Sequence, residues 1–426
     1  MPWPQFHLRR LFRRPRSGPN RAHTNGGSFH PQVEGLEQRL LLTINEFPVS
    51  IGSHPIGISS GPDGNIWFTE QDLDRIGVMR TDGTLLAEYP VRTAYSRPEF
   101  IVAGPDGNMW FTEQRAGKIG RITLDGTVTE FAVAAGSNPT FITAGPDGNL
   151  WFSEYSANNI GRITPGGTVT EFTVPTFNSH PMGITVGPDN NIWFTEFTGN
   201  KVGSLTLDGS RFTEYPIGTA NSQPIGISTG WDGNLWFAEF RYPASKIGRM
   251  AADGSGFIDF DVPGSTSDVE TVIAGPDGNM WYADSEGNKL GVVDGNGNIA
   301  EFATPTSSSG PLGLTLGPDQ TDIWFAEIDS NQIGQYLFDG APHTGGGRGA
   351  LGVEREAWSV RREAWTRNEA IVEARYEQPM MADAARALNS GPQNVLSPVH
   401  PAANNHVAMD QVWAQLADEP LLMSAE

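Results

Sequence analysis

Short apolar phrases alternate with polar turn phrases along residues 44–340. One set reads PIGIS (55–59), NIWFTE (65–70), RIGVM (75–79) and LAEYPV (86–91), and similar sets follow it along the chain. Runs of β-branched and aromatic residues that are bounded by Gly, Pro, Asn or Asp are typical of strands joined by tight turns. We therefore predict four short strands in each set and an all-β fold.

The sets form a repeat that is marked by one tryptophan in each copy. The spacings between successive copies are 43, 41, 42, 43, 45 and 43 residues, and the tryptophans are Trp67, Trp110, Trp151, Trp193, Trp236, Trp281 and Trp324. Each follows a turn phrase such as GPDGNIW (61–67). Four strands at this period are the unit of a β-propeller blade. The repeat therefore predicts seven blades, with each tryptophan packed between blades.

The order of the phrases also predicts how the ring closes. The phrase that ends each set first occurs as INEFPV (44–49), before any complete set, and it is missing after residues 311–338. We expect residues 44–49 to supply the outer strand of the seventh blade. Such closure joins the two ends of the repeat and leaves no open sheet edge.

The sequence outside the repeat divides into three further predicted regions. Residues 1–43 are expected to be a basic, largely disordered leader, and residues 341–352 (APHTGGGRGALG) a Gly-rich linker. Residues 353–426 lose the turn phrases and gain Ala, Glu and Arg, so we expect a partly helical tail. It either docks on a partner or on the propeller, or is weakly ordered.

Charge and composition exclude several kinds of protein. The formal net charge of the chain is −21, and acidic residues dominate residues 44–340, which argues against a nucleic-acid partner. The sequence contains no cysteine, so disulfides and thiolate chemistry are excluded. No apolar run approaches the length of a membrane span.

The leader suggests export without a conventional signal peptide. It carries LRRLFRRPR (8–16), but no apolar segment of the expected length follows. The phrase VEGLEQRLLLT (33–43) resembles a short LExRxLL segment of exported bacterial surface proteins. We expect an extracellular or cell-surface location, and the alternative is a basic leader with no targeting role.

Two positions in each repeat are expected to lie near one mouth of the central channel, where propellers bind ligands. The first position is occupied by Ile56, Glu99, Thr140, Met182, Ile225, Glu270 and Leu312. The second, three residues after each tryptophan, is acidic throughout: Glu70, Glu113, Glu154, Glu196, Glu239, Asp284 and Glu327. An acid that recurs in every blade is either a metal ligand or, more simply, a blade-building acceptor of backbone N–H bonds.

The sixth copy differs because it gathers three carboxylates, Asp268, Glu270 and Asp284. Asp268 and Glu270 lie on one side of an extended strand, and a hairpin partner would bring Asp284 alongside them. Clustered carboxylates repel, so either a cation or a shared proton offsets the charge, or the groups are simply solvated. Oxygen ligands suit Mg²⁺ or Ca²⁺. His54 and His180, both in SHP phrases, are more simply explained by loop packing.

The repeat GPDGNIWFTE…KIGRIT..GTVTEF resembles the virginiamycin B lyase, or streptogramin lyase, family over residues 44–340. That resemblance implies a seven-bladed propeller that opens a cyclic depsipeptide antibiotic by elimination, with Mg²⁺ and a histidine base. The family signature Glu-x-His-Gly-Ile falls on residues 268–272, with a further carboxylate at Asp284. The resemblance thus implies metal ligands at Asp268 and Asp284, and it places the catalytic position at Glu270.

Other positions also depart from the family pattern. A second family histidine falls on Ile225 and a tyrosine on Ile56. With Glu99, these residues form the expected substrate-binding set. The sequence therefore predicts a binding or interaction module with a degenerate centre, a divalent-cation site and a small-molecule or surface ligand at the mouth. The alternative is a Mg²⁺-dependent carbon–oxygen lyase with Glu270 as its base.

Overall fold

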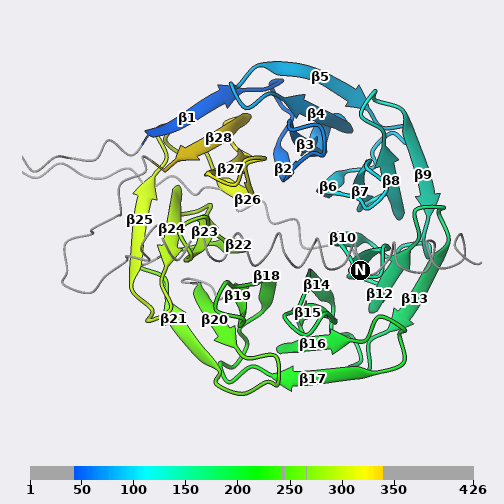
Figure 1. Cartoon of the computed structure of the whole chain (residues 1–426), viewed down its shortest axis with the longest axis vertical. Helices are drawn as coiled ribbons and strands as arrows, with labels where there is room; N and C mark the ends of the chain where they lie inside the picture. Colours follow the sequence, from blue (N-terminus) through cyan, green and yellow to red (C-terminus); the bar gives the residue numbers. More distant parts are fainter. Residues whose placement is uncertain (1–42, 241–244, 265, 339–426) are drawn as a thin grey trace, which may run out of the picture. The chain divides into compact units, whose positions relative to one another are not determined.

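The computed structural model describes residues 43–338, apart from residues 241–244 and 265. These residues form 28 strands in seven four-stranded antiparallel sheets, plus one short 3-10 helix, η1 (Gln71–Leu73). The sheets are arranged around a common centre, and each has one strand innermost and one outermost (Figure 1). The prediction of an all-β, seven-bladed propeller is confirmed.

The innermost strands begin with proline in every blade except blade six, where valine takes its place. They are β2 (Pro55–Ser60), β6 (Pro98–Ala103), β10 (Pro139–Ala144), β14 (Pro181–Val186), β18 (Pro224–Thr229), β22 (Val269–Ala274) and β26 (Pro311–Leu316). The second strands carry the tryptophans. They are β3 (Ile66–Glu70), β7 (Met109–Glu113), β11 (Leu150–Glu154), β15 (Ile192–Glu196), β19 (Leu235–Glu239), β23 (Met280–Asp284) and β27 (Asp322–Glu327).

The third strands share an apolar residue followed by glycine. They are β4 (Arg75–Met79), β8 (Lys118–Ile122), β12 (Asn159–Ile163), β16 (Lys201–Leu205), β20 (Lys246–Met250), β24 (Lys289–Val293) and β28 (Gln332–Leu337). The outer strands are β1 (Thr43–Pro48), β5 (Leu85–Pro90), β9 (Val128–Ala132), β13 (Val169–Thr173), β17 (Phe212–Pro216), β21 (Ile258–Asp261) and β25 (Ile299–Ala303).

The ring closes as the phrase order predicts. The seventh sheet has the strand order β1-β28-β27-β26, so the first strand of the chain completes the last blade (Figure 1). Phe47 lies opposite Ile333 in this pairing and stacks on Trp324, with 5.6 Å between ring centroids. The closing strand is therefore held by backbone pairing and by a buried aromatic contact.

Each blade tryptophan is buried and packs against the following blade. Trp193, for example, clusters with Ile227, Leu235 and Phe237 of blade five. Its indole N–H donates to Asp189 of the preceding turn at 2.8 Å, which satisfies the polar atom of an otherwise apolar side chain. The same bond to the turn aspartate recurs in other blades. The predicted packing of the tryptophans between blades is confirmed.

The predicted leader up to residue 42, the predicted linker (341–352) and the predicted partly helical tail (353–426) lie outside the described residues. Export therefore stays a prediction, which fractionation of producing cells would test. Within the described residues, no helix is long and apolar enough to cross a membrane.

Replacing Trp193 with alanine is expected to lower the free energy of unfolding by about 3–5 kcal/mol, because it leaves a cavity between blades four and five. Urea unfolding followed by circular dichroism measures the loss. Trp231→Ala is the matched control, since Trp231 is 44% exposed, and it should cost less than half as much. An unfolding free energy equal to wild type in Trp193→Ala would contradict the packing of Trp193 between blades.

Candidate functional site at blade six

The loop that enters blade six differs in backbone conformation from the corresponding loops. In blade four, Asn178 and His180 flank Ser179 with φ of 51° and 54°, and Pro181 begins the strand. The residue after Ser267 in blade six is Asp268, which is not in the left-handed region, and valine takes the place of proline. The replacement of the Ser-x-Pro phrase by Ser-Asp-Val is therefore a local signal of a reshaped site.

Asp284 forms the buried end of this site. Its side chain is fully buried, and its Oδ1 accepts backbone N–H bonds from Asp268 at 2.8 Å and from Gly287 at 2.9 Å. A Cβ at position 287 would lie 2.1 Å from Asp284 Oδ2, so glycine makes room for the carboxylate. Burial raises the pKa of Asp284, and the two backbone bonds oppose that shift.

Glu270 lies at a β-bulge on the innermost strand. Val269 pairs with Asp284 and Thr271 pairs with Ala283, so Glu270 is the extra residue between the two pairs. A bulge turns a side chain away from the regular alternation of a strand. On the neighbouring blade, a Cβ at Gly226 would lie 2.3 Å from the Glu270 carbonyl oxygen, so glycine allows blade five to approach this backbone closely.

The predicted substrate-binding residues occupy matching positions on other innermost strands. Ile56 follows the first residue of β2, and Ile225 follows that of β18; both are buried. Glu99 has the same position on β6, is partly exposed, and accepts a bond from Gln114 Nε2 at 2.9 Å. Figure 1 places these strands around the centre of the ring. No pattern in the sequence pointed to Gln114 as the partner of Glu99.

The three acids of blade six influence one another electrostatically. Burial raises the pKa of Asp268, and the charges of Asp284 and Glu286 raise it further. Burial likewise raises the pKa of Glu270, followed by the charges of Asp268 and Glu99. Both effects disfavour the ionised form, so the cluster favours protons or a cation.

Two carboxylate oxygens in this cluster are buried and accept no hydrogen bond in the described part of the chain, Asp268 Oδ1 and Asp284 Oδ2. Such atoms are free to act as ligands to a hard cation. In the described part of the chain, no three His, Cys, Asp or Glu side chains are placed to hold one metal ion. Any protein ligand set drawn from these acids thus involves at most two carboxylates.

The other acids that follow the blade tryptophans are packed inside their own blades. All seven members of the set are fully buried. Asp284 meets the expectation that they accept backbone N–H bonds. Glu113 does not meet it, since neither of its buried oxygens accepts a backbone N–H bond, and its neighbours are Glu130, Lys118 and the Ser96 hydroxyl. Burial, followed by the charge of Glu130, raises the pKa of Glu113 to about 8. Glu113 therefore acts as a neutral, buried acid between strands.

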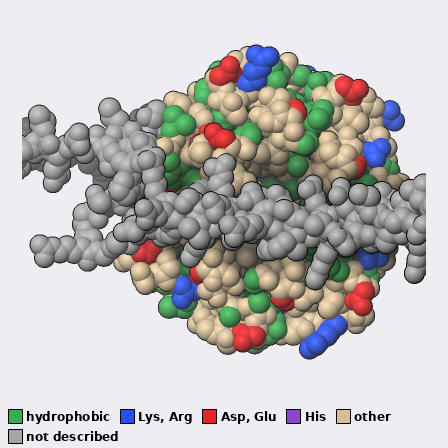
Figure 2. All heavy atoms as spheres, in the orientation of Figure 1, with side chains coloured by type: hydrophobic (Ala, Val, Ile, Leu, Met, Phe, Trp, Pro, Cys, Tyr) green, Lys and Arg blue, Asp and Glu red, His purple; other side chains and the backbone are tan. Residues whose placement is uncertain are grey.

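The two loop histidines are held by local contacts. His54 pairs with Asp72 through Nδ1. His180 stacks on Tyr155 with 4.4 Å between ring centroids, and its Nδ1 lies 2.8 Å from Thr198 Oγ1. Burial lowers the pKa of His180. On the face drawn in Figure 2, acidic and basic side chains are scattered over the visible parts of the blades.

Glu113→Gln is expected to reduce the loss of stability that accompanies a rise in pH from 5 to 8. A carboxyl whose pKa rises from 4.5 to about 8 on folding contributes stability that is complete below pH 4.5 and is lost as the pH rises through 8. The melting temperature at each pH measures this effect. Asp82→Asn is the control, because the pKa of this exposed aspartate is lowered and it does not titrate in that window. Equal slopes in wild type and Glu113→Gln would contradict the assignment.

Comparisons with known proteins point to one family. The profile of the virginiamycin B lyase family matches residues 42–257 and 211–343. A solved streptogramin B lyase structure is 34% identical, with a TM-score of 0.65, and the match covers 69% of this chain and 97% of that one. Virginiamycin B lyase from Staphylococcus aureus is also 34% identical, with a TM-score of 0.65 and coverage of 70% and 99%.

A third similar structure is a catalytically inactive histidine-to-alanine variant of the Staphylococcus aureus virginiamycin B lyase with quinupristin. It has the same identity of 34%, the same TM-score of 0.65, and coverage of 70% and 99%. A search of curated proteins gave no match. With the family profile spanning nearly all of the described propeller, this chain belongs to the virginiamycin B lyase family.

Proposed function

We propose that this chain is a binding propeller of the virginiamycin B lyase type, with a degenerate catalytic centre and a divalent-cation site in blade six. The observation that carries the proposal is that Asp268 and Asp284 of blade six each have one buried carboxylate oxygen without a hydrogen-bond partner. Its ligand is a small molecule or surface group that reaches the mouth of the channel.

The acids of blade six suit Mg²⁺ as the cation. Mg²⁺ is often held by one or two carboxylates and keeps several of its waters. Asp268 and Asp284 would hold the ion through their free oxygens, Oδ1 and Oδ2. The backbone N–H bonds to Asp284 Oδ1 fix its carboxylate in place before any ion arrives. When bound, the ion would supply positive charge for an oxygen atom of the ligand.

Glu270 is less suited to base catalysis than the histidine implied by the family resemblance. Burial and the charge of Asp268 both raise its pKa, which favours the neutral acid, and a neutral carboxylic acid donates a proton rather than accepting one. The buried Ile56 and Ile225 offer apolar surface where polar groups would orient a substrate. These features support binding over turnover.

Calorimetric titration with Mg²⁺ and Ca²⁺ tests the cation site. Wild-type protein is expected to bind, and affinity should fall at least about tenfold in Asp268→Asn and in Asp284→Asn, since each removes one charged ligand. The asparagine amide in Asp284→Asn keeps an Oδ1 acceptor for the two backbone bonds, so the fold should persist. Asp208→Asn, at an exposed turn of blade four, is the matched control and should bind like wild type. Unchanged affinity in both site variants would overturn the site.

A carbon–oxygen lyase activity is the second candidate function, favoured by the 34% identity to streptogramin B lyase over 97% of that chain. A bound cation would lower the pKa of Glu270 and allow it to act as a base.

Incubation with a streptogramin B antibiotic and Mg²⁺, followed by reversed-phase chromatography and mass spectrometry, separates the two functions. Elimination opens the ring without a change of mass, so the chromatographic shift is the signal. We expect intact antibiotic. A linear product that disappears in Glu270→Gln would instead establish the lyase and reject the binding-only proposal.

A further inference from the structure

In three blades an arginine guanidinium group lies in the same surroundings, which form an arginine socket. Arg121, Arg162 and Arg249 lie on the third strands of blades two, three and five, each opposite the blade tryptophan. Their guanidinium carbons lie between 5.2 and 5.8 Å from the centroids of that tryptophan and of an outer-strand phenylalanine. These are cation–π distances.

Each of these arginines also reaches the next blade. Nη1 donates to a turn carbonyl there: Arg121 to Pro165 at 3.0 Å, Arg162 to Leu207 at 2.9 Å, and Arg249 to Gly295 at 2.6 Å. In blade two, Arg121 Nη1 also lies 3.7 Å from the turn carboxylate of Asp106. In all three blades the socket therefore consists of an aromatic pair and a carbonyl of the following blade, and in blade two a turn carboxylate lies nearby as well.

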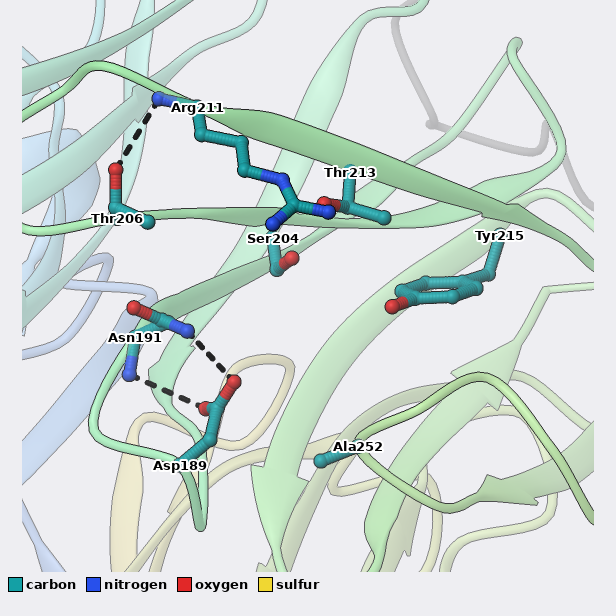
Figure 3. Close-up of a pocket in the computed structure, with 8 residues that line it drawn as sticks. All are labelled: Asp189, Asn191, Ser204, Thr206, Arg211, Thr213, Tyr215 and Ala252. Atoms are coloured by element: carbon teal, nitrogen blue, oxygen red, sulfur yellow. Dashed lines mark hydrogen bonds between the residues drawn. The ribbon is translucent and has the colours of Figure 1, made fainter.

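Blade four has the socket without its arginine. Ser204 lies opposite Trp193, in the register that Arg162 occupies opposite Trp151. The shorter side chain leaves a cavity of about 180 Å³, lined by Ser204, Asp189, Tyr215 and Ala252 among others (Figure 3). This volume is well above what one water molecule needs.

The residues around the cavity match several parts of the socket. Tyr215 lines the cavity, and the fully buried Trp193 stacks on it, with 5.5 Å between centroids and 13° between planes. Asp189 is the turn carboxylate that corresponds to the one in blade two. Ala252 occupies the place in its turn that Leu207 occupies in the turn of blade four, where the carbonyl accepts from Arg162.

Arg211 is an exposed residue that also lines the cavity. Figure 3 shows its side chain extending toward Ser204 and Thr213 rather than toward Asp189. Within the described residues, the guanidinium groups found stacked on blade aromatics are those of the three socket arginines. The positive charge of Arg211 opposes a second cation nearby, and the negative charge of Asp189 offsets it.

We propose that this cavity between blades four and five binds the guanidinium group of an external ligand, either a small guanidino compound or an arginine side chain of a peptide. A planar guanidinium matches the site because it can stack on Tyr215 and donate in its own plane to Asp189, both of which line the cavity. A lysine ammonium is compact and strongly hydrated and fits this geometry less well. The site is separate from the blade-six cluster and does not depend on the function proposed there.

Nuclear magnetic resonance of protein labelled with ¹⁵N at the tryptophan indoles tests the proposal at single-residue level. Titration with Nα-acetyl-argininamide should shift the indole N–H signal of Trp193, with a dissociation constant on the order of millimolar. The neutral isostere Nα-acetyl-citrullinamide should bind at least about tenfold more weakly, since it lacks the charge that Tyr215 and Asp189 attract. Millimolar ligand stays far below the concentrations at which guanidinium salts unfold proteins.

Two variants provide matched controls. In Ser204→Arg the socket is filled from within, so the Trp193 signal should no longer respond. In Arg162→Ser the socket of blade three is emptied, so Trp151 should gain the response that Trp193 shows in wild type. The second variant predicts a gain of binding, which a general loss of folding cannot produce.

Several outcomes would overturn the proposal. They are no Trp193 response in wild type, an equal response to citrullinamide, or a response to inorganic phosphate in place of the arginine compound. A response confined to Arg211→Gln would show that Arg211 itself is the resident group, and it would overturn the proposal of an external ligand.

Two further ligands identify the source of the guanidinium. Equal affinities for methylguanidine and for the peptide Ala-Arg-Ala would support a small guanidino ligand. Binding of the peptide that is at least about tenfold tighter, or about 1.4 kcal/mol, would support an arginine side chain of a polypeptide.

Discussion

The burial of one tryptophan between each pair of blades is the interaction on which the rest of this structure depends. A propeller blade is a twisted four-stranded sheet, and its two faces must be covered by its neighbours. The indole fills that interface, and its N–H would be costly to bury without an acceptor. The turn aspartate supplies the acceptor, as Asp189 does for Trp193 at 2.8 Å. The aspartate side chain thus stabilises its own turn and orients the buried tryptophan.

Because every blade shares this frame, the informative positions are those at which one copy departs from the others. Blade six replaces a proline by Val269 and gains Asp268, and its loop leaves the left-handed conformation found in blade four. Blade four replaces an arginine by Ser204 and gains a cavity. Both departures leave the packing of the tryptophans between blades intact, since Trp281 and Trp193 keep their bonds to the turn aspartates. A repeat can therefore acquire sites locally without losing its fold.

Buried carboxyl groups are held in two different ways in this molecule. Glu113 is surrounded by the side chains of its own blade, and burial raises its pKa, which favours the neutral acid. Asp284 occupies the equivalent position, but two backbone N–H bonds hold its Oδ1. Backbone bonds thus orient the carboxyl group in blade six, whereas burial among side chains holds it in blade two.

The sequence by itself determined the number of blades, their strand order and the closure by residues 44–49, because these follow from a period and from phrases missing at one end. It also indicated Asp268, Glu270 and Asp284 as one group, since a strand and its hairpin partner are local. Only the tertiary structure decided which oxygens of that group lack partners. It also decided that Ser204 and Ala252, from neighbouring blades, line one cavity. Contacts between blades join residues that are tens of positions apart, such as Thr69 and Glu99 (30 positions) or Arg162 and Leu207 (45 positions). The curvature of the ring sets these contacts, and no local pattern encodes it.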